Sequence, residues 1–126
     1  MRKQYHFRQK GKDTWIWDID RLVSLTRNYE TIKFPLEEIR ELDEAFWYGF
    51  PTDVPTCRSV AEHAKLIQES SLEHPIILSP EGRVMDGMHR VCKAYISGMT
   101  TIKARKFDIL PEPDYINIPA DELPLV

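Results

Sequence analysis

Five consecutive residues, Asp86-Gly87-Met88-His89-Arg90, carry the side chains best suited to chemistry in this chain of 126 residues. They stand between a short apolar stretch that predicts a strand and a run that predicts a helix. The first turn of a helix presents unpaired N–H groups and the positive end of the helix dipole, and both favour a bound anion such as phosphate. The sequence therefore predicts a phosphate site at this junction.

Each residue of this segment has its own expected role. Gly87 lets the backbone approach an anion without a Cβ in the way. Arg90 offers a fork of donors for phosphate oxygens, and His89 offers a donor that can also move protons. Asp86 is placed to orient His89 or to hold a divalent cation. The alternative is a structural role, in which Arg90 pairs with an acid and His89 caps a turn.

The elements expected around this segment follow in chain order: a strand over 74–79, a turn over 80–83, a strand over 84–86, a helix over 88–97 and a half-buried strand over 101–107. The helix is expected to turn Val91, Ala94 and Tyr95 inward and to end at Gly98 in a left-handed cap. Cys92, on the same helix, is expected to serve packing.

The expected elements upstream are a helix capped by Asp18, a short strand over 30–34, a helical turn over 36–42 and a helix capped by Thr56. The last helix carries an apolar stripe at Val60, Ala64 and Ile67, with His63 beside it as a packed or surface residue. The aromatic segment from Phe46 to Phe50 predicts a loop folded onto the core. The alternative for that segment is a stacking wall over a planar ligand.

The order of these features resembles the ParB/sulfiredoxin-like superfamily, in which a Gly-x-[His/Arg]-Arg motif opens a helix that ends at glycine before another strand. The residues that match are Gly87, His89, Arg90, Gly98 and Ile102. The resemblance covers residues 31–107 and implies an α+β fold, with a small mixed sheet flanked by helices. We therefore expect one compact domain over 1–126, with a basic arm over 1–14 and a proline-rich extended tail over 108–126.

The resemblance also implies a nucleotide site. The matching segment binds CTP phosphates in ParB proteins, ATP in sulfiredoxin, and the phosphates of an adenine nucleotide in free-serine kinases of this fold. For this chain it implies that Asp86, Gly87, Met88, His89 and Arg90 hold a nucleoside di- or triphosphate with Mg²⁺, Asp86 being the metal ligand.

The kinases of this fold use an acid near the first strand to activate the acceptor hydroxyl, and the resemblance carries that role to the acidic turn. Asp43 and Glu44 are the candidates, with Glu41 as the fallback and His89 as a further catalytic candidate. The alternative is that these acids form the solvated face of a short helix.

Met88 stands where sulfiredoxin has its catalytic cysteine, which argues against sulfiredoxin activity, and 126 residues do not hold ParB's DNA-binding region. The remaining expectation is a phosphotransferase or nucleotide hydrolase acting on a small molecule. The alternative is a non-catalytic ParB-like module in a nucleic-acid or protein complex. The acceptor, the base, the oligomeric state and whether any catalysis occurs are left open.

Composition excludes several other classes of protein. Hydrophobic residues make up 42% and charged residues 29%, which argues against disorder. No apolar run approaches the roughly 18 residues of a membrane span. Two cysteines, Cys57 and Cys92, are too few for a disulfide scaffold. No apolar segment follows the basic start, so we expect a cytoplasmic protein without a secretory signal.

The net charge of −3 hides an asymmetry along the chain. Residues 1–12 carry five basic and no acidic side chains, which leaves twelve basic against twenty acidic residues in the remainder. A basic arm can contact a polyanion, but the acidic body disfavours nucleic acid as the partner. A solvated, frayed terminus is the preferred interpretation of the arm.

Overall fold

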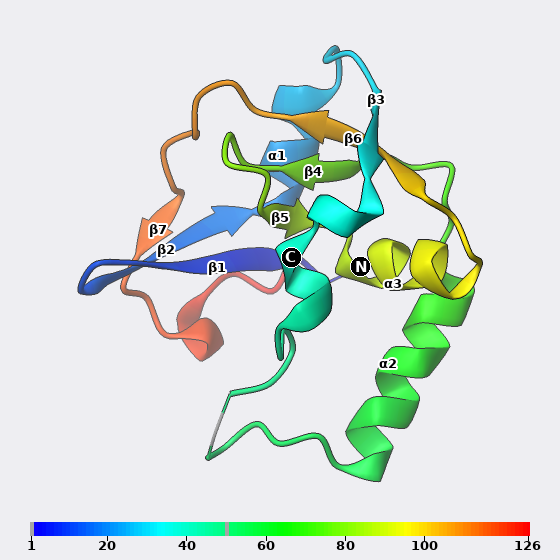
Figure 1. Cartoon of the computed structure of the whole chain (residues 1–126). Helices are drawn as coiled ribbons and strands as arrows, with labels where there is room; N and C mark the ends of the chain where they lie inside the picture. The colour runs from blue at the N-terminus through cyan, green and yellow to red at the C-terminus, as the bar shows by residue number, and fades with distance from the viewer. Residues whose placement is uncertain (1, 50) are drawn as a thin grey trace.

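The computed structural model describes residues 2–49 and 51–126, and within them the chain forms two small sheets and three helices (Figure 1). In chain order the strands and helices are β1 (Tyr5–Lys10), β2 (Asp13–Asp18), α1 (Ile19–Thr26), β3 (Ile32–Pro35), α2 (Cys57–Glu69), β4 (Ile76–Leu78), β5 (Val84–Asp86), α3 (Met88–Ile96), β6 (Thr101–Lys106) and β7 (Tyr115–Ile116). Three 3-10 turns complete the set: η1 (Leu36–Glu38), η2 (Arg40–Asp43) and η3 (Ala120–Glu122). The expected α+β class is confirmed.

The larger sheet has the strand order β3-β6-β4-β5, in which β4 runs parallel to β6 and the other neighbours are antiparallel. Because successive side chains of a strand point to opposite faces, Ile76 and Leu78 lie on one face and Ile77 on the other. The first face packs against α3 and the 3-10 turns, through residues such as Val91 and Ile39. The other packs against α1 and β2. The sheet therefore lies between two layers.

The N-terminal residues form a paired hairpin, so the interpretation of residues 1–14 as a frayed, solvated arm is wrong. β1 pairs antiparallel with β2 over its whole length, around a turn that contains Gly11 at a φ of 62°. Trp17 of β2 is fully buried against the larger sheet, and this burial holds the hairpin onto the body. The basic side chains of β1 lie on the protein, with Arg8 bonded to Glu81 at 2.6 Å.

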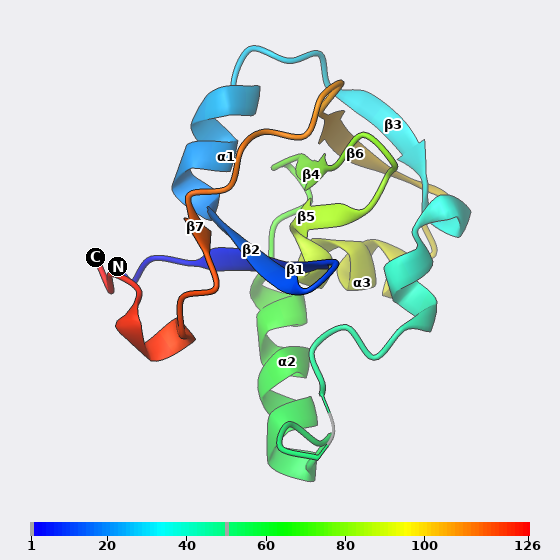
Figure 2. The same ribbon diagram turned by 90° about the vertical axis from the view of Figure 1, so that its left-hand side faces the viewer.

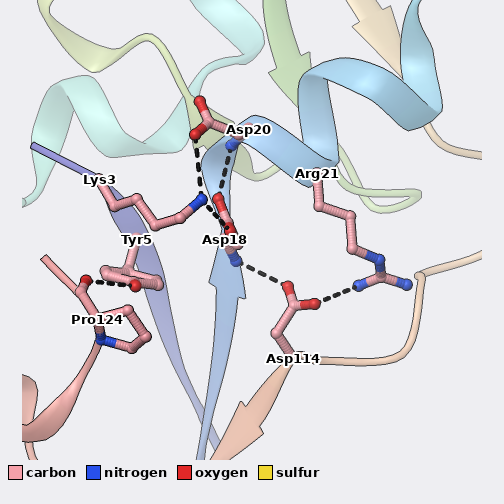
Figure 3. A network of polar contacts seen from close by, with 7 residues as sticks. All are labelled: Lys3, Tyr5, Asp18, Asp20, Arg21, Asp114 and Pro124. Carbon is pink, nitrogen blue, oxygen red and sulfur yellow. Dashed lines mark hydrogen bonds and ion pairs between the residues drawn. The ribbon is translucent and has the colours of Figure 1, made fainter. Parts of the chain in front are cut away.

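Polar contacts fasten the hairpin to α1 and to the C-terminal segment (Figure 3). The Lys3 ammonium lies 2.7 Å from an Asp18 oxygen and 3.2 Å from an Asp20 oxygen. These hydrogen bonds, first with Asp18 and then with Asp20, raise the pKa of Lys3 to about 12. Asp114 accepts hydrogen bonds from the Asp18 N–H and from the Arg21 guanidinium. Lys3 and Arg8 thus serve intramolecular contacts.

The proline-rich segment 108–126 contains only β7 and η3 as regular elements. β7 pairs antiparallel with β2, which makes it the third strand of the smaller sheet. The Lys3 N–H donates to the Leu125 carbonyl at 2.9 Å, and Figure 2 shows the two ends of the chain beside each other. The segment is therefore tied to the hairpin.

Most of the helix ends lie where the sequence predicts them. The Asp18 side chain caps α1, the Thr56 side chain caps α2, and Gly98 follows α3 at a φ of 75°. Val91 and Ala94 are buried as expected, and Cys92 packs against the same core. The prediction that Tyr95 points inward is wrong, because this residue is 66% exposed.

The second helix differs from the other two. α2 has no buried residue and extends away from the sheets in both views (Figures 1 and 2). Val60 of its apolar stripe is 49% exposed, and Ala64 is exposed as well. The side that faces the body carries Ser59 and His63 instead. No helix in the described part of the chain has the length and apolarity that a membrane span requires.

Candidate functional site

The segment from Asp86 to Arg90 is a strand, a glycine turn and a helix start, as the sequence predicts. Gly87 is the N-cap residue of α3, at a φ of 108°, and no side chain caps the helix. The first hydrogen bond of the helix runs from the Val91 N–H to the Gly87 carbonyl at 3.0 Å. The N–H groups of Met88, His89 and Arg90 therefore have no acceptor within the helix.

Gly87 is required for packing, which corrects the role expected for it. A Cβ at this position would lie 2.6 Å from Cγ2 of Ile76 and 3.0 Å from Nη2 of Arg90. The positive φ of Gly87 adds strain for any residue with a side chain. The space beside its Cα is thus occupied by protein atoms, and an anion would approach the N–H groups of the next residues instead.

Arg90 has the structural role given above as the alternative, in which it pairs with an acid. Its Nη1 donates to the carbonyls of His74 at 2.9 Å and Pro75 at 2.7 Å, and its Nη2 donates to Asp86 at 3.0 Å. Both charged side chains are largely buried, at 16% and 18% exposure. Arg90 therefore anchors the segment that enters β4, and Asp86 is engaged by Arg90 and not by His89.

His89 belongs to an aromatic cluster. Its Nε2 lies 2.9 Å from Nδ1 of His63, and the Trp47 ring stacks on both imidazoles at centroid distances of 4.5 and 4.2 Å. Burial, and then the neighbouring His63, lower the pKa of His89. His89 is consequently neutral near pH 7 and acts there as a hydrogen-bonding group.

The sequence leaves two roles open for the aromatic segment, a loop packed onto the core or a stacking wall for a ligand, and different residues of the segment fit each role. Trp47 and Tyr48 are half-buried, and the Tyr48 hydroxyl accepts a hydrogen bond from Ser59 at 3.1 Å. Phe46 is 39% exposed and forms part of a cavity wall. Phe50 lies outside the described residues. Trp47 therefore packs against the body, whereas Phe46 is available to a planar ligand.

Two cavities meet at this place. The helix cavity, about 390 Å³, is lined by the residues from Met85 to His89 together with Trp47 and residues 4–6. The hairpin cavity, about 450 Å³, is lined by residues 6–10 of β1, Glu41, and the turn that precedes β5. The two cavities share three residues, His6, Phe46 and Val84. We call these two adjoining cavities the groove; its lining residues extend from the N-terminus of α3 to Glu41.

Of the three candidate acids, only the fallback lies in this groove. Asp43 is exposed and lines a different cavity, beside η1 and the end of α3. Glu44 is held by Arg83 through two hydrogen bonds of 2.7 and 2.9 Å. Asp43 and Glu44 are therefore poorly placed for the expected role. Asp43 is the last residue of η2 and Glu44 is the next residue. Both are exposed, and the Glu44 carboxylate is bonded to Arg83.

Glu41 is the buried acid of the groove, with a residue exposure of 3%. Its Oε2 accepts the Val84 N–H at 2.7 Å and lies 3.3 Å from Nε of Arg83. Its Oε1 has no hydrogen-bonding partner. The carboxylate thus covers the open edge of β5 with one oxygen and retains an unused acceptor on the other.

His6 is a groove residue that the sequence interpretation missed. Its ring lies against Trp17, with a centroid distance of 5.8 Å, and its Nε2 also lacks a partner. Burial, with a smaller effect of the Arg8 charge, lowers the pKa of His6 to about 4. The signal that locates it is the hairpin itself, two short β-leaning runs around Gly11, whose basic residues by themselves predict an arm.

The expected metal ligand, Asp86, belongs to no cluster of three or more metal-binding side chains (His, Cys, Asp or Glu) among the described residues. Mg²⁺ is commonly held by one or two carboxylates together with phosphate oxygens and water. Asp86, already bonded to Arg90, can therefore contribute to Mg²⁺ only beside a bound phosphate.

No protein-family model, curated protein or solved structure matches the chain. The geometry of the groove therefore has to carry the functional interpretation alone.

Proposed function

We propose that the protein is a nucleotide-binding phosphotransferase or nucleotide hydrolase of ParB/sulfiredoxin-like type. The observation that carries this proposal is the groove: the uncapped N-terminus of α3 and Glu41, whose carboxylate is bonded through one oxygen only, line two cavities that share three wall residues. The mixed sheet and the strand–glycine–helix order of residues 84–96 support the fold likeness.

In this proposal the phosphates bind at the backbone of the helix start. The free N–H groups of Met88 and His89 donate to phosphate oxygens, and the helix dipole adds a positive potential there. The His89 side chain offers one further donor. Arg90 acts indirectly, because its bonds to Asp86 and to the β4 entry hold the glycine turn in shape. Phe46, exposed at the junction of the two cavities, provides a face on which a base can stack.

Phosphoryl transfer depends on positioning and on charge stabilisation more than on covalent chemistry by the protein. Glu41 replaces Asp43 and Glu44 as the acid that takes the proton from an attacking hydroxyl or water. Its Oε1 has no hydrogen-bonding partner and accepts that proton once a side chain of the cavity wall turns aside, whereas Oε2 is fixed by Val84 and Arg83. A bound Mg²⁺, with Asp86 as its protein ligand, would neutralise phosphate charge.

A non-catalytic nucleotide-binding module is the second candidate. The observation that favours it is that Arg90 and Glu44, both expected to serve the chemistry, are committed to intramolecular ion pairs. Binding without turnover separates this candidate from the first.

The decisive experiment places a charge at the phosphate end of the groove. His89→Asp puts a carboxylate at the second helical position, where it satisfies the free N–H groups and repels phosphate. His89→Asn is the matched control, since it loses the same imidazole contacts without adding charge. We expect ATP, ADP, CTP or GTP with Mg²⁺ to raise the melting temperature of the wild type and of His89→Asn, because a ligand of the native state stabilises it.

For His89→Asp we expect no nucleotide-induced shift. An equal shift in the two variants would contradict the proposed phosphate site, as would the absence of any shift in the wild type. Turnover is then measured in Glu41→Gln, which keeps the acceptor for Val84 but removes the base. A loss of about 10²–10⁴ in rate is expected. Nucleotide binding with no wild-type turnover toward any small hydroxyl compound would favour the binding module.

A further inference from the structure

The hairpin end of the groove has bonding capacity that the protein itself does not use. In the described part of the chain, two buried side-chain polar atoms lack a hydrogen-bonding partner, namely Nε2 of His6 and Oε1 of Glu41. Both residues line the hairpin cavity. Because buried polar atoms are nearly always paired in native proteins, two unpaired atoms that belong to residues lining one cavity indicate a ligand group that bonds to them.

We propose that the hairpin cavity binds a small uncharged compound with several hydroxyl groups, held by His6 and Glu41. As the acceptor half of the groove, this site rests on the proposed function. A hydroxyl group suits the two atoms because it both donates and accepts. The Glu41 carboxylate oxygen only accepts, and the neutral imidazole of His6 can donate or accept according to its tautomer.

The charges around the cavity argue against an ionic ligand. Arg8 is paired with Glu81 at 2.6 Å, and Arg83 is paired with Glu44 at 2.7 Å and with Glu41 at 3.3 Å. The two arginines are therefore already neutralised by the protein, and a carboxylate or phosphate ligand would meet the unpaired oxygen of Glu41. A cationic ligand would meet Lys10, which lines the same cavity and has no ion-pair partner among the described residues.

The backbone of β1 explains why several hydroxyls are expected. β1 is an edge strand, with β2 on one side only, so half of its backbone N–H and C=O groups have no strand partner. Five consecutive residues of β1, from His6 to Lys10, line the cavity. A compound with several hydroxyls can bond to this edge and to the two buried atoms. Because both buried atoms are closed to bulk water, a side chain of the wall must turn aside as the compound enters.

The test uses the whole protein without nucleotide and follows binding by saturation-transfer NMR, together with the ring ¹⁵N shifts of His6. The probes are glycerol, myo-inositol and glucose, with glucosamine and glucuronate as charged counterparts of glucose. We expect at least one uncharged probe to bind and to move the Nε2 shift of His6. We expect the two charged sugars to bind at least tenfold more weakly than glucose.

Two variants assign the binding to the cavity. His6→Phe keeps a ring against Trp17 and removes Nε2, and Glu41→Gln keeps the acceptor for the Val84 N–H while replacing the carboxylate. Each is expected to weaken binding of the uncharged probe at least tenfold. The matched controls, His74→Phe and Glu38→Gln, lie outside the cavity on exposed positions and are expected to bind as the wild type does.

The proposal is overturned if no uncharged probe binds, if a charged sugar binds more tightly than glucose, or if binding survives in both cavity variants. Failure of the proposed function has a different signature. If a nucleotide stabilises the protein and no polyol binds, the hairpin site alone is wrong. If a polyol binds with the expected variant pattern and no nucleotide does, the hairpin site stands and the nucleotide function is wrong.

Discussion

The two ends of the groove are built in opposite ways. At the helix end, the charged side chains belong to one short segment, and Arg90 bonds to Asp86 four residues before it and to two carbonyls at the entry to β4. At the hairpin end, His6, Glu41 and Arg83 come from three distant parts of the chain. At the helix end the charged side chains bond to each other, whereas at the hairpin end two buried atoms have no partners.

This difference separates structural from functional demands within one site. The contacts of Arg90 with Asp86 and the β4 entry hold a turn that the fold requires, so substitution there should act mainly on stability. The unpaired atoms of His6 and Glu41 are a cost to the folded state. Substitution at the hairpin end should therefore act on binding and turnover, with smaller or even favourable effects on stability.

The largest expected effect on stability comes from Arg90→Ala. The change leaves the buried Asp86 carboxylate and the carbonyls of His74 and Pro75 without their donor. The free energy of unfolding should fall by about 2–4 kcal/mol, because a partly buried charge loses its partner. Urea denaturation of both proteins measures this loss. A change below about 0.5 kcal/mol would mean that the local network does not hold the turn, and the comparison between the two ends would fail.

Lys at the same position provides a graded control. Arg90→Lys keeps the charge for Asp86 but lacks the planar fork that serves both carbonyls and the carboxylate together. Its stability should lie between those of the wild type and Arg90→Ala.

The next effect is a dependence of stability on pH that originates at His6. The folded protein holds the pKa of His6 at about 4, below the ordinary value of 6.5, chiefly because the ring is buried. As the pH falls through 6.5 the unfolded chain takes up the proton first. The stabilisation present above pH 6.5 is therefore lost progressively down to about pH 4, to a total of roughly 2–3 kcal/mol.

His6→Phe should flatten this part of the pH profile and should raise stability at pH 7, because an unpaired buried nitrogen is removed. Thermal or urea unfolding between pH 4 and pH 8 follows both changes. His74→Phe, on the surface, should leave the profile unaltered. If the His6 variant retained the full wild-type slope, the source of the acid sensitivity would be another group, and His89, whose pKa is also lowered, would be examined next.

The same contrast explains how much the sequence predicts. The elements from β4 to β6, the glycine turn at Gly87 and the cap at Gly98 follow from local residue types, and the structure has them. The two carbonyls that Arg90 binds and the position of Glu41 follow from the register of β4 and β5 and from the path of η2. No local pattern encodes such contacts between residues that are distant in the chain.

The hairpin is the part of the fold that the sequence does not predict. The charge of the β1 residues by itself predicts a solvated arm, whereas the fully buried Ile16 and Trp17 that follow hold the hairpin onto the body. Two short strands that pair only with each other and with β7 are decided by tertiary contacts. The hairpin cavity, and His6 with it, therefore becomes visible only once β1 is placed against the turn before β5.

The smallest effect, and the one that best sharpens the comparison, is expected at Glu44. Its carboxylate is exposed and paired with Arg83, and this hydrogen bond lowers the pKa of Glu44. Glu44→Gln should change the free energy of unfolding by less than about 1 kcal/mol, as is usual for an exposed ion pair. Asp43→Asn, on an exposed residue of a different cavity, should have a similarly small effect.

Neither substitution should lower turnover, because neither side chain lines the groove. Glu41→Gln in the same series should lower turnover by about 10²–10⁴ while the protein stays folded. A tenfold loss of turnover in Glu44→Gln or Asp43→Asn, with Glu41→Gln fully active, would return the acid to the outer face of η2. It would then be the exposed turn, and not the buried end of the groove, that meets the phosphate.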